Sequence, residues 1–548
     1  MQDFVGCYGL YLYHQGGRFV LSNSFLRLSE YLRTRVRLSL NRDYANHFLA
    51  AGMTSLSYSQ TMLNEIEILP RNAIVHIDIS AGKYELEYID YHENTVWLSS
   101  PEGMKILDRW FARWKSFFCG LSSVTSNIEA DLSGGLDSRM VFVTLLKSGI
   151  DLNKICVRCY QGKSYTFEQD YRNASVIASA LGFTLNNDEN FTGGILNFSF
   201  EDSVKIPFYA KMSTHNQMQH KYSKYEDKRY KITGGGGETL REYWHSMVGT
   251  ERFFVSMASQ AWAFSGSLRA EFRYSTKRIL QDHIDKISQK TGLSAGLWPS
   301  SLIYRETWQR YHHGQEAVES LVANEYKISP LMDWELQQLK LNDPDCGDNN
   351  LLMAVIYERY APELLNFKFT NNESIDEKTR DFARRLSAKF PFSTTKEVQA
   401  TDFFAPVRDH EVSRLLEHNN HPLEKGTPQK LVKQAFESLP LRKLFATYFD
   451  EEICLYAEEY FRRTTHYPIS MCHSVVAVAK TLKDILISEG TASGLFDDLC
   501  SFTEPAYSSA SGHLMTSALK AKRFLRKKVL TFPRRVAGKI LRFLKLKH

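Results

Sequence analysis

The chain has 548 residues, more than one hydrophobic core usually organises, so several structural units are expected. A hydrophobic fraction of 43% with 24% charged residues, 30 Gly and 15 Pro excludes fibrous and disordered classes. The formal charge of +6 is uneven, because residues Leu519 to His548 hold 12 Lys and Arg and no acid, which leaves 56 basic against 62 acidic residues elsewhere. This acidic body argues against a nucleic-acid-binding surface on it.

The first hundred residues predict a small α+β region. Aromatic and β-branched runs at 4–13, 18–22 and 73–79 indicate strands, one helix is expected over 42–51, and 69–91 predicts a hairpin that turns at 80–83. The start of the chain has no basic segment leading into an apolar one, and no run of about 18 apolar residues occurs. Neither secretion nor membrane spanning is therefore expected.

An α/β pattern begins near Pro101. A helix over 105–118 precedes a strand over 126–132, a turn over 133–136 and a helix over 137–147; a strand over 155–160 and a helix over 171–181 repeat the unit. That order predicts parallel strands. Residues 253–362 are expected to be mostly helical, 374–390 and 441–463 to form a helical extension, and 508–512 to be a linker.

Eight cysteines are sparse for this length and favour a reducing cytoplasm. Cys156 and Cys159 have the CxxC spacing of redox or zinc sites, but no second pair accompanies them. They lie in an expected strand, where residues three apart face opposite sides. The favoured interpretation is two packed thiols.

The most informative motif is ADLSGGLDSR, from Ala130 to Arg139. A strand that leads through S-G-G-x-D-S into a helix presents backbone N–H groups and a hydroxyl at the positive end of the helix, which suits pyrophosphate. Glycines allow the anion to approach, and Asp137 fits there chiefly if Mg²⁺ lies between carboxylate and phosphate. The alternative is an ordinary Ser/Gly turn whose Asp caps the next helix.

This segment resembles the PP-loop of asparagine-synthetase-like ATP pyrophosphatases, whose signature is SGGxDS. The P-loop signature GxxxxGK[ST] is absent from the sequence. The resemblance implies an α/β fold of the adenine nucleotide alpha-hydrolase-like (PP-loop) type with a parallel sheet. It also implies that ATP, with Mg²⁺ as cofactor, is cut between its α and β phosphates, so that the chemistry is adenylation.

Further segments match the family at similar distances. Glu168-x-Asp170 resembles its acidic residue after the second strand, and Gly234 to Tyr243 resembles its second nucleotide motif, with Glu238 at the usual Asp position and Thr239 at the usual Glu position. Segments 329–333 and 359–365 resemble its P-F-L-D segment and its Leu-Pro helix end. The resemblance assigns ATP and pyrophosphate binding to Leu132, Ser133, Gly134, Gly135, Leu136, Asp137, Ser138, Gly234, Gly235, Gly236 and Gly237.

The resemblance also implies catalytic roles for Asp137 and Glu238, which would hold the metal, and for a lysine after Pro362. In the family that lysine stabilises charge during adenylation; here the candidate is Lys368, and an exposed lysine without a role is the alternative. Family members that hydrolyse glutamine use a cysteine directly after the initiator methionine, but this chain has Gln2. Cys7 would serve only after an unpredicted cleavage, since the nucleophile needs its adjacent base.

Four regions follow from these patterns. Residues 1–98 are a truncated, inactive glutaminase-like α+β region, 99–370 the asparagine-synthetase-like PP-loop domain, 371–512 a helical extension and 513–548 a basic amphipathic tail. In the tail, apolar residues recur at helical spacing between Lys and Arg, which predicts a peripheral contact with an anionic membrane surface. Docking on the acidic body or on a partner, and an RNA-binding arm, are the alternatives.

The expected function is ATP-dependent amide-bond formation through an acyl-adenylate, with a small-molecule carboxylate as acceptor. Without the glutaminase nucleophile, nitrogen should come from ammonia, a partner glutaminase or an amine, and the membrane-directed tail fits amidation of a sugar acid in surface-polysaccharide synthesis. The expected location is cytoplasmic, at the inner face of the membrane if the tail binds there, with nucleic acid an unfavoured partner. The alternatives are a PP-loop RNA-modifying ligase or thiolase that uses Cys156 and Cys159, and a degenerate, non-catalytic scaffold.

Overall fold

The computed structural model describes residues 6–51, 57–89, 95–162, 164–188, 194–197, 219–222, 229–240, 270, 274–282, 285, 304–311, 313–314, 325–340, 343, 346, 350–370, 374–392, 439–449 and 469–490. The chain divides into two compact units, Met1–Cys500 and Ser501–His548, and all of the described residues belong to the first. The expected linker over 508–512 and the basic tail over 513–548 lie outside the described residues.

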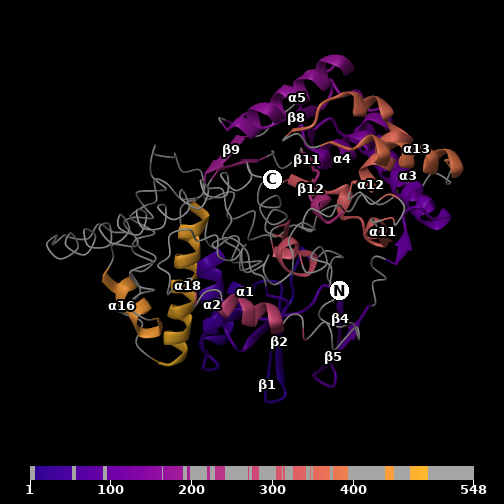
Figure 1. Ribbon diagram of the computed structural model, residues 1–548. Helices are drawn as coiled ribbons and strands as arrows, with labels where there is room; N and C mark the ends of the chain where they lie inside the picture. Colours follow the sequence, from indigo (N-terminus) through magenta and orange to yellow (C-terminus); the bar gives the residue numbers. More distant parts are fainter. Residues whose placement is uncertain are drawn as a thin grey trace, which may run out of the picture. The chain divides into compact units, whose positions relative to one another are not determined.

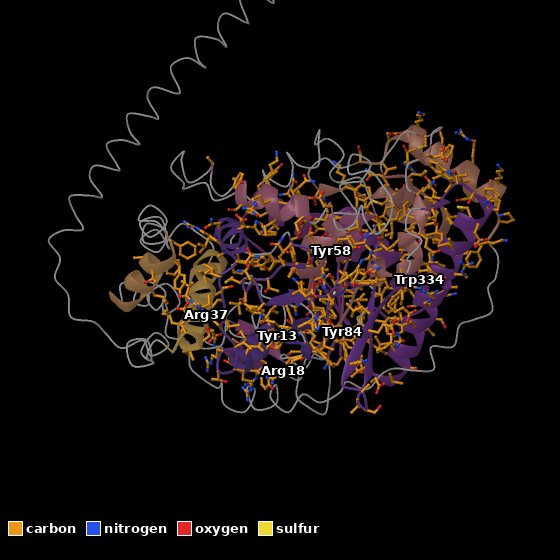
Figure 2. The ribbon with its side chains drawn as sticks, turned by 90° about the horizontal axis from the view of Figure 1, so that it is seen from below. Tyr13, Arg18, Arg37, Tyr58, Tyr84 and Trp334 are labelled. Carbon is orange, nitrogen blue, oxygen red and sulfur yellow. The ribbon has the colours of Figure 1, made fainter. Side chains whose placement is uncertain are left out.

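The N-terminal residues form the expected α+β structure. Strands β1 (Tyr11–Gln15), β2 (Arg18–Ser22) and β3 (Ile66–Ile68) make an antiparallel sheet in the order β2-β1-β3, and β4 (Ala73–Asp78) and β5 (Lys83–Tyr88) form the expected hairpin. The ring of Tyr84 on β5, labelled in Figure 2, contacts that of Phe19 on β2 at 4.7 Å between centroids. At the tip of the hairpin Ile77 and Ile79 are exposed, so the apolar alternation there does not mark a buried face.

Two helices, rather than one, interrupt these strands. Helix α2 (Arg42–Ala51) confirms the prediction, whereas α1 (Phe25–Leu32) was not expected. The Ser24 hydroxyl accepts a hydrogen bond from the backbone N–H of Arg27, which satisfies one of the unpaired donors at the start of α1. Spacings of three and four place Phe25, Leu28 and Leu32 on its buried side.

The α/β pattern after Pro101 is confirmed. A parallel four-stranded sheet has the order β12-β11-β7-β8, with β7 (Ile128–Asp131), β8 (Cys156–Arg158), β11 (Arg229–Ile232) and β12 (Glu325–Ile328). Helices α4 (Leu136–Lys147) and α5 (Tyr165–Leu181) follow β7 and β8, and α5 begins six residues before the predicted start, where Ser164 caps it. The described residues of 253–362 are mainly helical, as expected, and the exceptions are two short strands, β12 and β13 (Leu339–Lys340). In β12, charged and apolar side chains alternate.

The two faces of this sheet differ in character. One face carries Ile128, Ala130, Val157, Ile232 and Ile328, which pack in a core with residues of α3 (Pro101–Val124), α4 and α12 (Leu351–Tyr360). Helix α4 contacts both α3 and α12, and Figure 1 shows α4 and α12 close to β11 and β12. On the other face, three of the strands each carry two charged residues: Glu129 and Asp131 on β7, Arg229 and Lys231 on β11, and Glu325 and Lys327 on β12. Parallel sheets usually carry apolar residues on both faces, so this one is unusual.

Helices are found within two segments where the sequence predicts them: α13 (Glu377–Lys389) and α16 (Leu439–Tyr448). Residues 450–463 lie outside the described residues. A further helix, α18 (Ile469–Ser488), runs alongside α1 and α2 (Figure 1). Its Asp484 accepts hydrogen bonds from the Ser29 hydroxyl at 2.9 Å and from Arg33 at 2.7 Å. Helix α18 therefore packs on the N-terminal region, and α16 packs on α18.

Shorter elements complete the described part: β6 (Val96–Trp97), β9 (Gly194–Asn197), β10 (Gln219–Tyr222), β13 (Leu339–Lys340), η1 (Gly237–Thr239), η3 (Arg305–Gln309), η4 (Pro330–Met332), α11 (Trp334–Gln337) and η5 (Pro362–Asn366). A search of the described residues for a helix long and apolar enough to cross a membrane gives none.

Candidate functional site

The SGGLDS segment forms the turn between β7 and α4, as the sequence predicts. Strand β7 ends at Asp131 and α4 begins at Leu136, with Gly135 as its N-cap. In any helix, the backbone N–H groups of the first turn have no partner within the helix. Here Gly135 has no side chain that could accept a hydrogen bond from them. These donors and the helix dipole give the turn the character of an anion site.

Two serine hydroxyls lie at the centre of the turn. The oxygens of Ser133 and Ser138 are 2.9 Å apart, the Ser133 backbone N–H donates to Ser138 Oγ at 2.9 Å, and the Gly135 N–H donates to Ser133 Oγ at 3.1 Å. One hydroxyl proton is used between the two oxygens, whichever serine is the donor. The other proton remains to be donated to a ligand.

The carbonyl groups of the turn are bound by neighbouring elements. The Gly134 carbonyl accepts from the Thr370 backbone N–H at 2.9 Å and from Arg139 at 3.2 Å, and the Leu136 carbonyl accepts from the buried Tyr357 hydroxyl at 2.8 Å. These hydrogen bonds keep the two carbonyl oxygens, which carry partial negative charge, pointed toward neighbouring protein groups. Of the turn's polar groups, the donors are therefore better placed than the acceptors to meet an anion.

The two predicted glycine-rich loops meet. The first loop is the turn at residues 133–138, and the second loop is residues 234–237. A Cβ added at Gly237 would stand 2.6 Å from both Cβ and Oδ1 of Asp137, and one added at Gly234 would stand 2.7 Å from the backbone nitrogen of Ser138. Both distances are shorter than real Cβ contacts, so neither position has room for a side chain. Glycine at 234 and 237 therefore lets the second loop lie directly on the first turn of α4, with Asp137 between them.

The other side of the second loop lies on η4 and on residue 313. Gly236 has φ +90°, a left-handed conformation that favours glycine, and a Cβ there would stand 2.6 Å from Met332 Cγ. Gly235 is the least crowded of the four, since a Cβ would have the His313 ring as its nearest neighbour, at 3.1 Å. The run of glycines is thus packed on both sides.

Glu238 follows this loop and accepts several hydrogen bonds. Its Oε1 accepts from the Tyr304 hydroxyl and from His313 Nε2, each at 3.0 Å, and its Oε2 accepts from the Gly236 N–H at 3.1 Å. Burial alone would raise the pKa of Glu238, but hydrogen bonds, first from His313, and the charge of His313 hold it at about 2. Glu238 is therefore ionised at neutral pH.

Asp137 is a suitable ligand for Mg²⁺, because its side chain lies where the second loop meets the first turn of α4. Carboxylates beside phosphate oxygens are the usual ligands of Mg²⁺. Glu238 already accepts three hydrogen bonds, so fewer of its lone pairs remain for a cation. Thr239, at the position where the family usually has Glu, donates instead to the Gly236 carbonyl at 2.7 Å and stabilises the loop.

Lys368 lies on an exposed part of the segment that follows η5. Its backbone carbonyl accepts a hydrogen bond from Arg139, and two residues later Thr370 pairs with Gly134. The structure thus brings the backbone around Lys368 next to the first loop. A catalytic role for the Lys368 side chain remains a prediction.

The two acidic residues predicted on α5, Glu168 and Asp170, lie in different surroundings. Asp170 and Asn173 face the first loop, since a Cβ at Gly134 would stand 3.0 Å from Asp170 Oδ1 and 2.9 Å from Asn173 Nδ2, and closer still to Thr370 Oγ1. Glu168 instead lines a surface groove along α5. Asp170 is therefore the member of the pair that neighbours the site.

Several residues around the loops were not found from the sequence. Arg139 and Tyr357 bind loop carbonyls, and Tyr304 and His313 bind Glu238; their positions depend on pairings far apart in sequence. Lys327 is near Asp131, Lys231 and Glu238, and burial, followed by the charge of Lys231, lowers its pKa to about 8. Charged residues two apart before a loop, as at 129 and 131 or 325 and 327, could have indicated this charged face.

The two cysteines of the CxxC pair lie inside the protein. Cys156 and Cys159 are buried free thiols, and burial raises the pKa of Cys156 to about 11 and that of Cys159 to about 12. Cys156, Glu129 and Asp188 have ligand atoms within 4.8 Å of one another, but Arg158 forms ion pairs with both carboxylates. The interpretation of two packed thiols fits these surroundings. Cys7 is also buried.

No protein-family model matches this sequence, and a search of curated proteins also finds no match. The resemblance to asparagine-synthetase-like enzymes is thus one of motifs and their spacing.

Proposed function

We propose that this chain is an ATP-dependent, AMP-forming ligase of the asparagine synthase type, with a PP-loop fold. One observation carries the proposal: the two glycine-rich loops expected to bind one nucleotide, about a hundred residues apart in sequence, pack on each other with Asp137 against Gly237. They do so beside the start of α4 and after strands of a parallel sheet, where nucleotides bind in α/β proteins.

The loop residues supply most of what pyrophosphate release requires. Backbone N–H groups of the turn, with one hydroxyl proton of the Ser133 and Ser138 pair, would hold the β and γ phosphates of ATP. Asp137 would hold Mg²⁺, with Glu238 as the second predicted ligand. When bound, Mg²⁺ supplies positive charge beside the phosphates. Lys368 would stabilise charge that develops at the α phosphate.

Two steps account for the reaction. An oxygen of the substrate carboxylate attacks the α phosphate; the bond between that phosphorus and the bridging oxygen breaks, and pyrophosphate leaves with the electron pair. The resulting acyl-adenylate is attacked at its carbonyl carbon by ammonia or an amine, which loses a proton as AMP leaves. The donors around the first loop favour the first step, because they stabilise the leaving pyrophosphate.

The nitrogen source is proposed to be free ammonia, an amine or a partner glutaminase. Gln2 stands where glutamine-hydrolysing relatives have their nucleophilic cysteine, and Cys7 is buried. The basic tail over 513–548 suggests a reaction at the inner membrane surface, for which a sugar acid of surface-polysaccharide synthesis is the proposed acceptor.

Pyrophosphate release from ATP tests this function. The full chain and its Asp137→Ala variant are assayed over a panel of carboxylates, sugar acids included, with ammonium or glutamine as nitrogen source. We expect release that depends on one class of carboxylate, is supported by ammonium and falls at least about 100-fold in the variant. Equal, negligible release from both proteins under every condition would refute the synthetase, and a preference for glutamine would refute the inactive glutaminase region.

A further inference from the structure

Arg139 directly follows the SGGLDS motif, and its side chain is fully buried beneath the first loop. Its Nη1 donates to the Phe367 carbonyl at 3.1 Å, and its Nη2 donates to the Gly134 carbonyl at 3.2 Å and to the Lys368 carbonyl. The guanidinium carbon lies 4.3 Å from the centre of the Phe369 ring. One guanidinium thus joins the first loop to residues 367–369.

The hydrogen bonds of Arg139 determine the shape of the loop. The peptide group between Gly134 and Gly135 is held at both ends: its carbonyl accepts from Arg139 and Thr370, and its N–H donates to Ser133 Oγ. Because a peptide group is planar, fixing both ends fixes its orientation. Ser133 Oγ also forms a hydrogen bond with the Ser138 hydroxyl, so the position of Arg139 affects both hydroxyls of the first loop.

The charge of Arg139 has no carboxylate partner in the described part of the chain. Its contacts are three carbonyl oxygens and an aromatic ring, and it forms no ion pair among the residues that the structure describes. A buried, unpaired charge is costly, so a nearby anion would be strongly favoured.

We propose that Arg139 is a positioning residue that couples pyrophosphate binding in the first loop to the placement of the 367–370 segment, which carries Lys368. The proposal rests on the proposed function and names how that site is organised. The negative charge of bound pyrophosphate stabilises the positive charge of the buried guanidinium. The hydrogen bonds from Arg139 to the carbonyls of Gly134, Phe367 and Lys368 then become stronger. A lysine at 139 would keep the charge but lack the planar fork that binds carbonyls on two segments.

The test compares Arg139→Lys and Arg139→Gln with a matched control, Arg359→Lys. Arg359 is another arginine with a buried side chain, but its guanidinium pairs with Asp108 away from the loops. Binding of Mg²⁺-pyrophosphate is measured by calorimetry, and kcat and KM for ATP by pyrophosphate release. We expect Arg139→Lys to bind pyrophosphate within about 3-fold of wild type while kcat falls at least 10-fold, and Arg139→Gln to lose at least 10-fold in both.

Hydrogen exchange on the unmodified chain gives a second measurement that does not depend on whether variants fold. Mg²⁺-pyrophosphate should slow amide exchange in residues 367–370 as well as in 133–138. Exchange that slows in the first loop alone, or an Arg139→Lys variant with wild-type kcat, overturns the coupling while leaving the proposed function in place. If wild-type protein binds pyrophosphate and both segments exchange more slowly, but ATP never yields pyrophosphate, only the proposed function is refuted. If wild-type protein binds no pyrophosphate, the coupling and the proposed function are both refuted.

Discussion

Replacing Gly237 by alanine tests whether the two loops form one site. The added Cβ would stand 2.6 Å from Cβ and Oδ1 of Asp137, whereas non-bonded carbon atoms prefer about 3.5 to 4.0 Å. Asp137 or the second loop must therefore move by about 1 Å. Overpacking of this kind costs about 1 to 3 kcal/mol of stability, and a 1 Å displacement of a reacting group can cost about 100-fold in rate.

Gly235→Ala is the matched control, because it adds the same methyl group to the same loop on the side away from Asp137. Its nearest neighbour would be His313 at 3.1 Å, and neither Gly235 nor Gly237 has a positive φ that alanine would strain. We expect Gly237→Ala to lower pyrophosphate release about 100-fold, and Gly235→Ala, whose new methyl group meets His313 and not Asp137, to lower it by about 10-fold or less. Equal rates for wild type and Gly237→Ala, or equal losses in both variants, would refute the contact.

A double-mutant cycle isolates the contact from effects on folding in general. Asp137→Gly removes all three side-chain atoms, Cβ, Cγ and Oδ1, that the new methyl group would meet. The free energy of unfolding, from urea titration of all four proteins, should show Gly237→Ala costing at least about 1 kcal/mol less in the Asp137→Gly background. Additive changes would mean that Asp137 does not contact residue 237.

Two further predictions concern Glu238 and the tail. The folded-state pKa of Glu238 is about 2 against an ordinary value of 4.5, so its ionised form stabilises the fold fully above about pH 4.5, and this contribution of about 3 kcal/mol disappears as the pH falls toward 2. Glu238→Gln should therefore unfold more easily than wild type at pH 7 and equally at pH 2 in denaturant titrations; a difference that is constant with pH contradicts this. Removing residues 513–548 should abolish flotation with vesicles that contain anionic lipid, and unchanged flotation removes the membrane proposal.

Local patterns in the sequence predicted the elements that depend on neighbouring residues. The strand, turn and helix around Ser133 to Ser138 follow from a strand that alternates apolar and charged residues, two glycines and a run of apolar residues in the helix. Helix α2 and the β4–β5 hairpin follow from periodicity and turn residues in the same way. The glycine run at 234–237 indicated a turn, though not which surfaces would exclude side chains.

Contacts between distant segments could not be predicted in this way. Strand β12 is too short for its sequence to distinguish a strand from a helix. It is defined by its pairing with β11, where Glu325 lies 3.9 Å from Arg229. Arg139 looks like an ordinary helix residue until the carbonyls at 367 and 368 are brought to it. The hydrogen bonds from Tyr304 and His313 to Glu238 likewise exist only once residues 304–313 are folded against the loop.

The products formed from ATP test the central claim most directly. The full chain is incubated with Mg²⁺-ATP, ammonium and the panel of carboxylates, and the nucleotides are separated and quantified. If the two loops hold pyrophosphate as a leaving group, AMP and pyrophosphate accumulate in equal amounts, and only when a suitable carboxylate is present. Formation of ADP and phosphate in their place would contradict cleavage between the α and β phosphates, and with it the assignment of the two loops.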